Sequence, residues 1–225
     1  MRGIKFGDGR FGYVHIPKVA CTSLKNAVYR FDTNEDYDSK KHGTFIHRYY
    51  GQQRDDLSDC EYRMLVVRDP VKRFLSAYGN RVLFHGELNE SYIRKNAENL
   101  LDEIPIYRPG LGQFIDHIES YQKVPSIHHH IKSIRIFTQE PTSAYSHVFK
   151  MNEIPKMEGL ISSVSGKEFR TRRLQTGGRK YYIQDLSSKQ LKKVIEMYED
   201  DYNYLKGFCS ISELEKEYKL GGGFV

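Results

Sequence analysis

The stretch YVHIPKVACTSLK, residues 13–25, decides the fold of this chain. Its apolar beginning predicts a short strand over residues 11–16, and its end opens a helix. That helix has its apolar residues at helical spacing, at Leu24, Ala27, Val28 and Phe31. The small-residue loop between the two elements contains Lys18. A helix start offers N–H groups and a positive dipole end to an oxyanion, and the lysine adds a mobile charge, so the stretch predicts a phosphate or sulfate cradle.

A second strand–loop–helix unit follows about fifty residues later. The apolar run YRMLVV, residues 62–67, is typical of a central parallel strand, and Asp69 with Pro70 predicts the start of the next helix. Arg68 stands at the end of this strand and Ser76 lies two turns along the helix. Two such units predict an α/β fold with a central, mostly parallel sheet flanked by helices. In such folds ligands bind at the carboxyl ends of the strands.

The remaining sequence predicts one domain over residues 1–225, since this length suits a single core. Residues 85–131 are weakly patterned and interrupted by prolines, which favours an acceptor-binding insertion. Short strands are expected over residues 133–138 and 146–151. Two C-terminal helices are expected to open at Ser187 and Ser212, each followed by Gln or Glu three residues later, and residues 221–225 form a loose tail.

The charge and the cysteine content indicate which partners and which cellular compartment suit the protein. The formal charge of +6 favours polyanionic partners. No apolar run reaches membrane-spanning length, so we expect no integral membrane segment. The odd set of three cysteines, Cys21, Cys60 and Cys209, favours a cytoplasmic protein, with a Golgi luminal domain separated from its anchor as the alternative. Nothing indicates a nucleic-acid reader fold, and the oligomeric state is not predicted.

The first loop differs from the nucleotide-triphosphate loop of the Walker type. That loop needs two glycines around its lysine, whereas Lys18 here precedes Thr22 by four residues with no glycine between them. A phosphoryl-transfer enzyme is therefore a weaker alternative. Arg68 and Ser76 on the second unit predict a second anion contact, since a guanidinium fork and a hydroxyl both suit phosphate. Two such contacts indicate a ligand with phosphates at both ends.

This pair of motifs, HIPKVACTSLK and VVRDPVKRFLSAY, resembles the sulfotransferases that use 3′-phosphoadenosine-5′-phosphosulfate (PAPS), in particular the carbohydrate branch with the heparan-sulfate 2-O and chondroitin/HNK-1 types. The resemblance implies a P-loop-like sulfotransferase fold and transfer of a sulfuryl group to a carbohydrate hydroxyl, with an acceptor that can be acidic. It implies that the 5′-phosphosulfate is bound by Lys18, Val19, Ala20, Cys21, Thr22 and Ser23. It also implies that Arg68 and Ser76 bind the 3′-phosphate and that no metal takes part.

The resemblance further implies a histidine base between the two motifs, and KKHGTFIHRYY offers two. His42 matches by its surroundings, being followed by Phe45 and Ile46, and is the first candidate. His47 lies closer to the expected distance from Arg68 and is the second. An aspartate or glutamate base stays open, since a base is defined by its reach to the acceptor hydroxyl.

Two further clusters invite a functional interpretation. Consecutive histidines at residues 128–130 point in different directions along one segment, so we expect no metal there and at most one substrate contact. The basic stretch RTRRLQTGGRKYY, residues 170–182, is either a lid over the nucleotide or acidic sugar, or a solvated surface loop. A non-catalytic glycan-binding relative of the same fold is the alternative to an enzyme.

Overall fold

The computed structural model describes residues 1–52, 55–172, 174 and 178–222. It divides into two compact units, one of Met1–Arg68 with Arg135–Thr176 and one of Asp69–Ile134 with Gly177–Val225. The chain passes between them three times, so neither unit is one continuous segment. The single domain over residues 1–225 stays a prediction.

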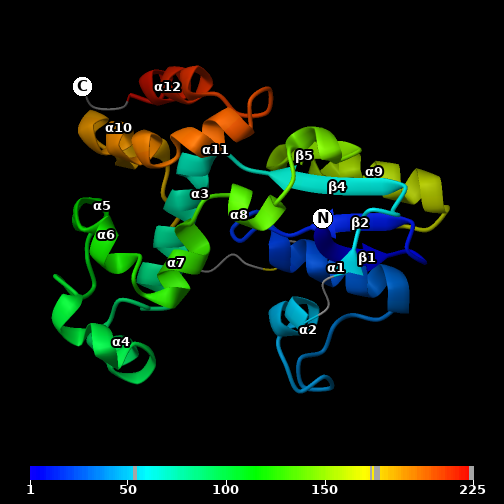
Figure 1. Cartoon of the computed structure of the whole chain (residues 1–225), viewed down its shortest axis with the longest axis horizontal. Coiled ribbons are helices and arrows are strands. Elements are labelled where there is room, and N and C mark those ends of the chain that lie inside the picture. Colours follow the sequence, from blue (N-terminus) through cyan, green and yellow to red (C-terminus); the bar gives the residue numbers. More distant parts are fainter. Residues whose placement is uncertain (53–54, 173, 175–177, 223–225) are drawn as a thin grey trace. The chain divides into compact units, whose positions relative to one another are not determined.

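The first unit is built on a five-stranded sheet with the order β3-β1-β2-β4-β5. Strands β1, β2, β4 and β5 are labelled in Figure 1. Its strands are β1 (Arg2–Phe6), β2 (Phe11–Val14), β3 (Asp55–Asp56), β4 (Tyr62–Val67) and β5 (His147–Lys150). Strands β2, β4 and β5 run parallel to one another, while β1 is antiparallel to both β2 and β3. The sheet is therefore mixed, and the expectation of a mostly parallel sheet was wrong.

The antiparallel half comes from an N-terminal hairpin that the sequence analysis missed. Gly7, Asp8 and Gly9 all have positive φ between β1 and β2, and the Arg10 N–H donates to the Gly7 carbonyl at 3.1 Å. Glycine and aspartate tolerate the left-handed region, which lets the chain reverse in a few residues. The turn signal GDGR was thus present in the sequence, next to a strand too short to stand out.

Helices of the first unit are α1 (Cys21–Thr33), α2 (Ile46–Gln52), α8 (Arg135–Thr138) and α9 (Ile154–Ser165), with short 3₁₀ turns at Thr142–Ala144 and Met151–Glu153. An aromatic cluster joins the hairpin, α1 and the segment after α9. The ring centroids of Phe6, Phe11, Phe31 and Phe169 lie 5.2–6.3 Å apart in their contacting pairs, a range typical of favourable aromatic packing. This cluster fixes α1 against the sheet and thereby positions the loop before it.

Most predicted elements of this unit are confirmed, and one is wrong. Strand β4 has the predicted bounds, and β5 falls within residues 146–151. Residues 133–138 are not a strand, because α8 forms there and ends at Thr138, before Gln139 with its φ of +63°. Ile134 is buried whereas Ile136 is 54% exposed, so the alternating pattern does not mark one buried face.

The described residues of the second unit form helices and loops and no strand. Its longer helices are α3 (Pro70–Ala77), α4 (Glu90–Asn96), α5 (Leu111–Asp116), α6 (Ile118–Tyr121), α7 (Pro125–Ile131), α10 (Ser188–Met197), α11 (Glu199–Tyr204) and α12 (Ile211–Leu220). A π-helix, Tyr78–Phe84, continues α3, and 3₁₀ turns lie at Glu98–Glu103 and Ile183–Asp185. Helix α3 is central, since Val71, Phe74 and Leu75 are buried in the core that α7 and α10 pack against. Residues 85–131 thus form ordered helices, and their role in acceptor binding stays a prediction.

Local capping signals set the ends of these helices. The Asp69 side chain accepts a hydrogen bond from the Lys72 N–H at 3.0 Å, and Ser187 forms a capping box with Gln190 as predicted. Helix α12 begins two residues earlier than expected, because its N-cap is Ser210, which accepts a hydrogen bond from the Glu213 N–H, and not Ser212. Of the tail expected at residues 221–225, the last three residues lie outside the described part of the chain.

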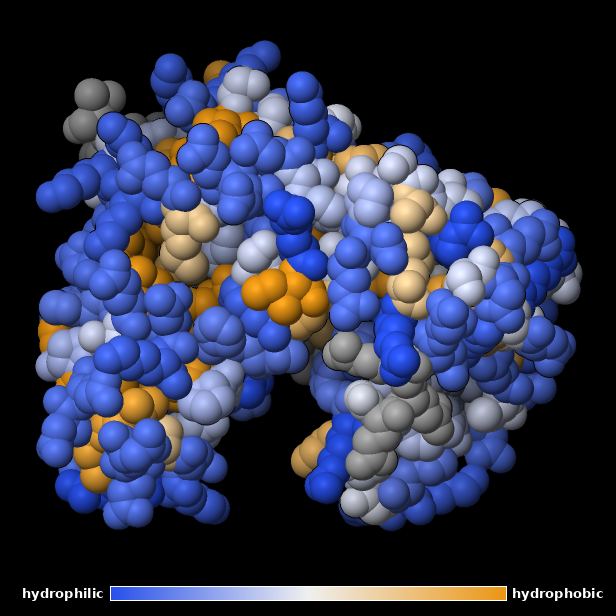
Figure 2. Space-filling view, in the orientation of Figure 1, coloured by the Kyte–Doolittle hydropathy of each residue, from blue (hydrophilic) through white to orange (hydrophobic). Residues whose placement is uncertain are grey.

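The visible surface is mostly hydrophilic, with hydrophobic residues in separate small areas (Figure 2). Phe45, directly before α2, is 77% exposed. Within the described residues, no helix combines the length and the apolar character needed to cross a bilayer.

Candidate functional site

The loop between β2 and α1 begins with a tight turn. The Val19 N–H donates to the Ile16 carbonyl at 3.3 Å, Pro17 occupies the second position and Lys18 the third, with φ +67°. Proline followed by a residue of positive φ is the pattern of a type II turn, whose third position usually holds glycine. A lysine there is uncommon, and such strained residues gather at functional sites.

The start of α1 offers N–H groups to an anion. Its N-cap residue, Ala20, has φ +50° and provides no side-chain cap, and the first helical hydrogen bond runs from the Leu24 N–H to the Ala20 carbonyl at 3.0 Å. Helix geometry therefore leaves the N–H groups of Cys21, Thr22 and Ser23 without an intrahelical acceptor. With the dipole of a 13-residue helix behind them, these groups favour a phosphate or sulfate.

Arg68 contacts this loop from the neighbouring strand. It follows β4, which pairs in parallel with β2, and its Nη1 donates to the Lys18 carbonyl at 3.0 Å. The structure thus brings together the arginine and the lysine that the sequence assigned to opposite ends of one ligand. Ser76 lies in α3, in the second unit, and its role stays a prediction.

Of the two candidate histidines, His47 lies at the start of α1. Its Nε2 is 2.8 Å from the Thr22 Oγ1, and the side chain is exposed. The Ser23 hydroxyl is also contacted, by the Leu174 N–H at 3.5 Å. The loop residues Lys18, Thr22 and Ser23 therefore lie together with His47 and Arg68 at one edge of the first unit.

His42 occupies a different place, in a cluster of tyrosines. Its ring stacks on Tyr37 with centroids 4.8 Å apart, its Nε2 is 2.8 Å from the Tyr29 hydroxyl, and Tyr49 contacts its edge. Tyr29 lies seven residues after Thr22 on α1, which corresponds to roughly 10 Å along the helix axis. His42 and His47 therefore contact α1 two turns apart, and only His47 is beside the loop.

The sequence analysis did not predict that tyrosines surround His42. Burial raises the pKa of Tyr37 and, more strongly, that of Tyr50, so both stay protonated and can donate. Tyr37 donates to the Thr44 carbonyl at 2.7 Å and thereby fixes the segment that leads into α2. Their only sequence signal was the density of tyrosines in this region.

The basic stretch at residues 170–182 is divided between the units, and residues 173 and 175–177 lie outside the described part. In the first unit Arg172 pairs with Asp36 at 2.7 Å. In the second, Arg179 lies 4.9 Å from the ring centre of Tyr181 and 3.8 Å from the Asp185 carboxylate. Exposed pairs of this kind contribute little to stability, and the lid function stays a prediction.

The histidines at residues 128–130 lie on α7, where successive side chains point about 100° apart. The His130 Nδ1 is 2.7 Å from the Ser126 carbonyl oxygen. Arg73, fully buried, donates to the carbonyls of His130, Ile131 and Lys132 and so caps this helix. Across the part of the chain that the structure describes, no group of three or more His, Cys, Asp or Glu side chains is placed to hold a metal ion.

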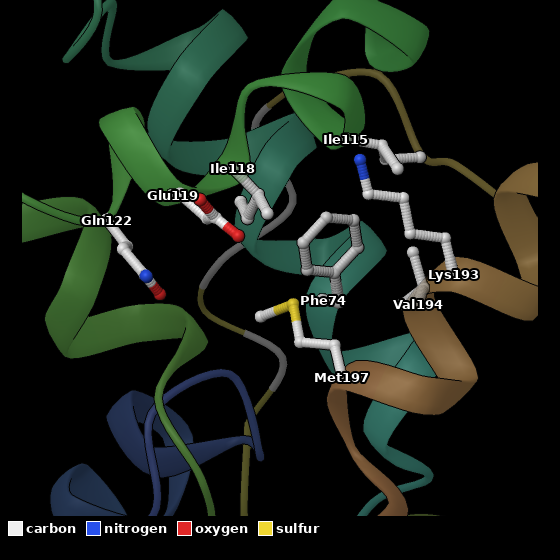
Figure 3. A pocket seen from close by; sticks show the side chains of 8 residues that line it. All are labelled: Phe74, Ile115, Ile118, Glu119, Gln122, Lys193, Val194 and Met197. Atoms are coloured by element: carbon white, nitrogen blue, oxygen red, sulfur yellow. The ribbon is translucent and has the colours of Figure 1, made fainter.

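A cavity of about 310 Å³ lies within the second unit (Figure 3). Its wall is mostly apolar and comes from α3, α5, α6 and α10, with polar groups at Glu119, Gln122 and Lys193. The apolar side chains are Phe74, Ile115, Ile118, Val194 and Met197. None of the predicted site residues lines it, so the sequence-based site and this cavity are separate features.

A loop that follows a parallel strand and leads into a helix with uncapped N–H groups is the arrangement with which many α/β proteins bind oxyanions. Comparison of the sequence with models of protein families gives a more specific assignment. Residues 6–206 match the model of the Sulfotransferase family, so the chain belongs to that family and is a transferase of sulfuryl groups. Comparisons with curated proteins and with solved structures found no match.

Proposed function

We propose that this protein transfers the sulfuryl group of PAPS to a hydroxyl of a carbohydrate acceptor. The observation that supports the proposal most is the loop itself. Lys18 stands in a strained turn, its carbonyl bound by Arg68, directly before a helix start with uncapped N–H groups. These groups suit the 5′-phosphosulfate, and the resemblance assigns the 3′-phosphate to Arg68 and Ser76.

The proposed reaction needs two kinds of assistance. The acceptor oxygen forms a bond to sulfur while the bond from sulfur to the bridging oxygen breaks, and the charge moves onto the 5′-phosphate of the departing adenosine 3′,5′-bisphosphate. Lys18 and the N–H groups of α1 stabilise this charge electrostatically. A base takes the acceptor proton, and positioning supplies much of the remaining rate, as in phosphoryl transfer.

We assign the base to His47, with His42 as the alternative. His47 contacts Thr22 in the anion loop, whereas the Nε2 of His42 is engaged by Tyr29 two helical turns away. A base must lie within hydrogen-bonding reach of the hydroxyl that attacks, so the position beside the loop favours His47. The preference from sequence surroundings alone was the reverse.

The acceptor and the compartment belong to the same proposal. A net charge of +6 favours an acidic sugar chain. Cys21, Cys60 and Cys209 all lie in the described part of the chain and none forms a disulfide, which favours a reducing, cytoplasmic setting.

The test is an acceptor screen with radiolabelled PAPS, combined with calorimetric titration of adenosine 3′,5′-bisphosphate. We expect binding by the wild-type protein, label transfer to at least one saccharide, and loss of transfer in Lys18→Ala. Binding of the nucleotide and the glycan without turnover would identify a non-catalytic relative. Absence of nucleotide binding would contradict the proposal.

A further inference from the structure

The turn before α1 is held in a conformation that its own residues disfavour. Lys18 and Ala20 both have left-handed backbones, with φ +67° and +50°, and neither is the glycine or asparagine that such positions usually hold. A backbone of this kind persists only where its surroundings hold it in place. Contacts to the turn therefore decide where the Lys18 side chain points.

Two interactions of the turn are seen at the backbone. Within the turn, the Val19 N–H reaches the Ile16 carbonyl at 3.3 Å, a long hydrogen bond. From outside, the Arg68 Nη1 donates to the Lys18 carbonyl at 3.0 Å. The second bond has a charged donor, and hydrogen bonds with one ionised partner are stronger than neutral ones.

We propose that Arg68 is a positioning residue for Lys18, in addition to its assigned contact with the 3′-phosphate. By holding the Lys18 carbonyl it keeps the turn in its left-handed form and so keeps the lysine and the N–H groups of α1 directed at one anion. Its loss then weakens the site for the 5′ end of the donor even when the ligand has no 3′-phosphate. The choice of ligand here rests on the proposed function, whereas the effect on the turn does not.

Two nucleotides separate the roles of Arg68. Adenosine 5′-phosphate has only the 5′ group, and adenosine 3′,5′-bisphosphate has both. In calorimetric titrations we expect Arg68→Ala to lower the affinity for adenosine 5′-phosphate at least tenfold and the affinity for the bisphosphate by a larger factor. An unchanged affinity for adenosine 5′-phosphate, with weakened bisphosphate, would overturn the positioning role.

A ligand-free measurement decides the inference independently. Hydrogen exchange of the Val19 amide reports the turn directly, and we expect Arg68→Ala to speed it at least tenfold. The matched control is Arg63→Ala, because Arg63 lies on β4, the strand that Arg68 follows, and donates to the carbonyls of Cys60 and Ala144. That control should leave Val19 exchange unchanged.

An unchanged Val19 exchange rate in Arg68→Ala would overturn the inference. Should this variant fail to fold, Arg68→Lys keeps the charge but not the guanidinium fork, and it should speed exchange by a smaller factor, with no change again contradicting the inference. If the wild-type protein binds neither nucleotide, the proposed function fails while the exchange experiment still decides the role of Arg68.

Discussion

The two histidines before β4 are expected to respond to mutation in different ways. Replacing His47 with Asn removes the proposed base, and loss of a general base typically lowers kcat by about 10²–10⁴-fold. Replacing His42 with Asn removes its hydrogen bond to Tyr29 and its stacking on Tyr37. These are worth about 1 kcal/mol and about 0.5–1.5 kcal/mol, so we expect a loss of roughly 2 kcal/mol of unfolding free energy.

For a chain of this size that loss corresponds to a fall of roughly 4–8 °C in the unfolding midpoint. The assay combines initial rates at saturating labelled PAPS with thermal unfolding in the same buffer. His117→Asn, at an exposed histidine that follows α5, is the matched control and should alter neither quantity. An unchanged kcat in His47→Asn would refute its role as the base, and an unchanged midpoint in His42→Asn would refute its structural role.

Three further substitutions test the backbone and the charges. Ala20→Gly should raise the unfolding midpoint by roughly 1–3 °C, because glycine relieves the left-handed backbone at φ +50°. Gly79→Ala should cost about 1–3 kcal/mol in urea unfolding, since its Cβ would lie 2.6 Å from the Arg179 carbonyl oxygen. Asp69→Asn should become increasingly stable relative to wild type as the pH rises above about 4, because burial raises the pKa of the Asp69 carboxyl.

The sign for Asp69 follows from linkage. A carboxyl whose pKa is higher in the folded than in the unfolded protein opposes folding once it ionises. The wild-type protein therefore loses stability as the pH rises through the folded pKa of Asp69, whereas Asp69→Asn does not. A difference in stability between Asp69→Asn and wild type that stays constant with pH would contradict this.

For Ala20→Gly the control is Ala27→Gly inside α1, which should lower the unfolding midpoint. Equal falls of the midpoint in both variants would contradict the prediction. For Gly79→Ala, an unchanged urea midpoint would contradict the prediction, since it would mean that the backbone at Gly79 and at Arg179 separates at no cost.

Strong local patterns in the sequence predicted the fold where burial and capping act together. Strand β4 is buried on both faces, so its continuous apolar run marked it without ambiguity, and Asp69 and Ser187 cap their helices as their neighbours indicated. Short elements failed for the opposite reason. Helix α8 has only four residues, and four residues cannot distinguish the helical from the strand period.

The candidate site was predictable in its chemistry but not in its contacts. Lys18, Thr22 and Arg68 were chosen as candidates because their residue types and their positions after strands favour anion binding, and these roles stay predictions. The hydrogen bond from Arg68 to the Lys18 carbonyl depends on a left-handed backbone at a lysine, which residue preferences argue against. The separation of His42 from His47 along α1 depends on the conformation of the polar loop between α1 and α2. A loop has no hydrophobic periodicity from which its conformation could be predicted.

The most direct test of the central claim is transfer of label from PAPS to a saccharide, measured for the wild-type protein and Lys18→Ala. The account predicts transfer by the wild-type protein and a fall of at least about 100-fold in kcat for the variant, as is typical when a group that stabilises transition-state charge is removed. The matched control is Lys41→Ala, because Lys41 is exposed and pairs with Glu35. Equal transfer rates in the wild-type protein and Lys18→Ala would contradict the claim.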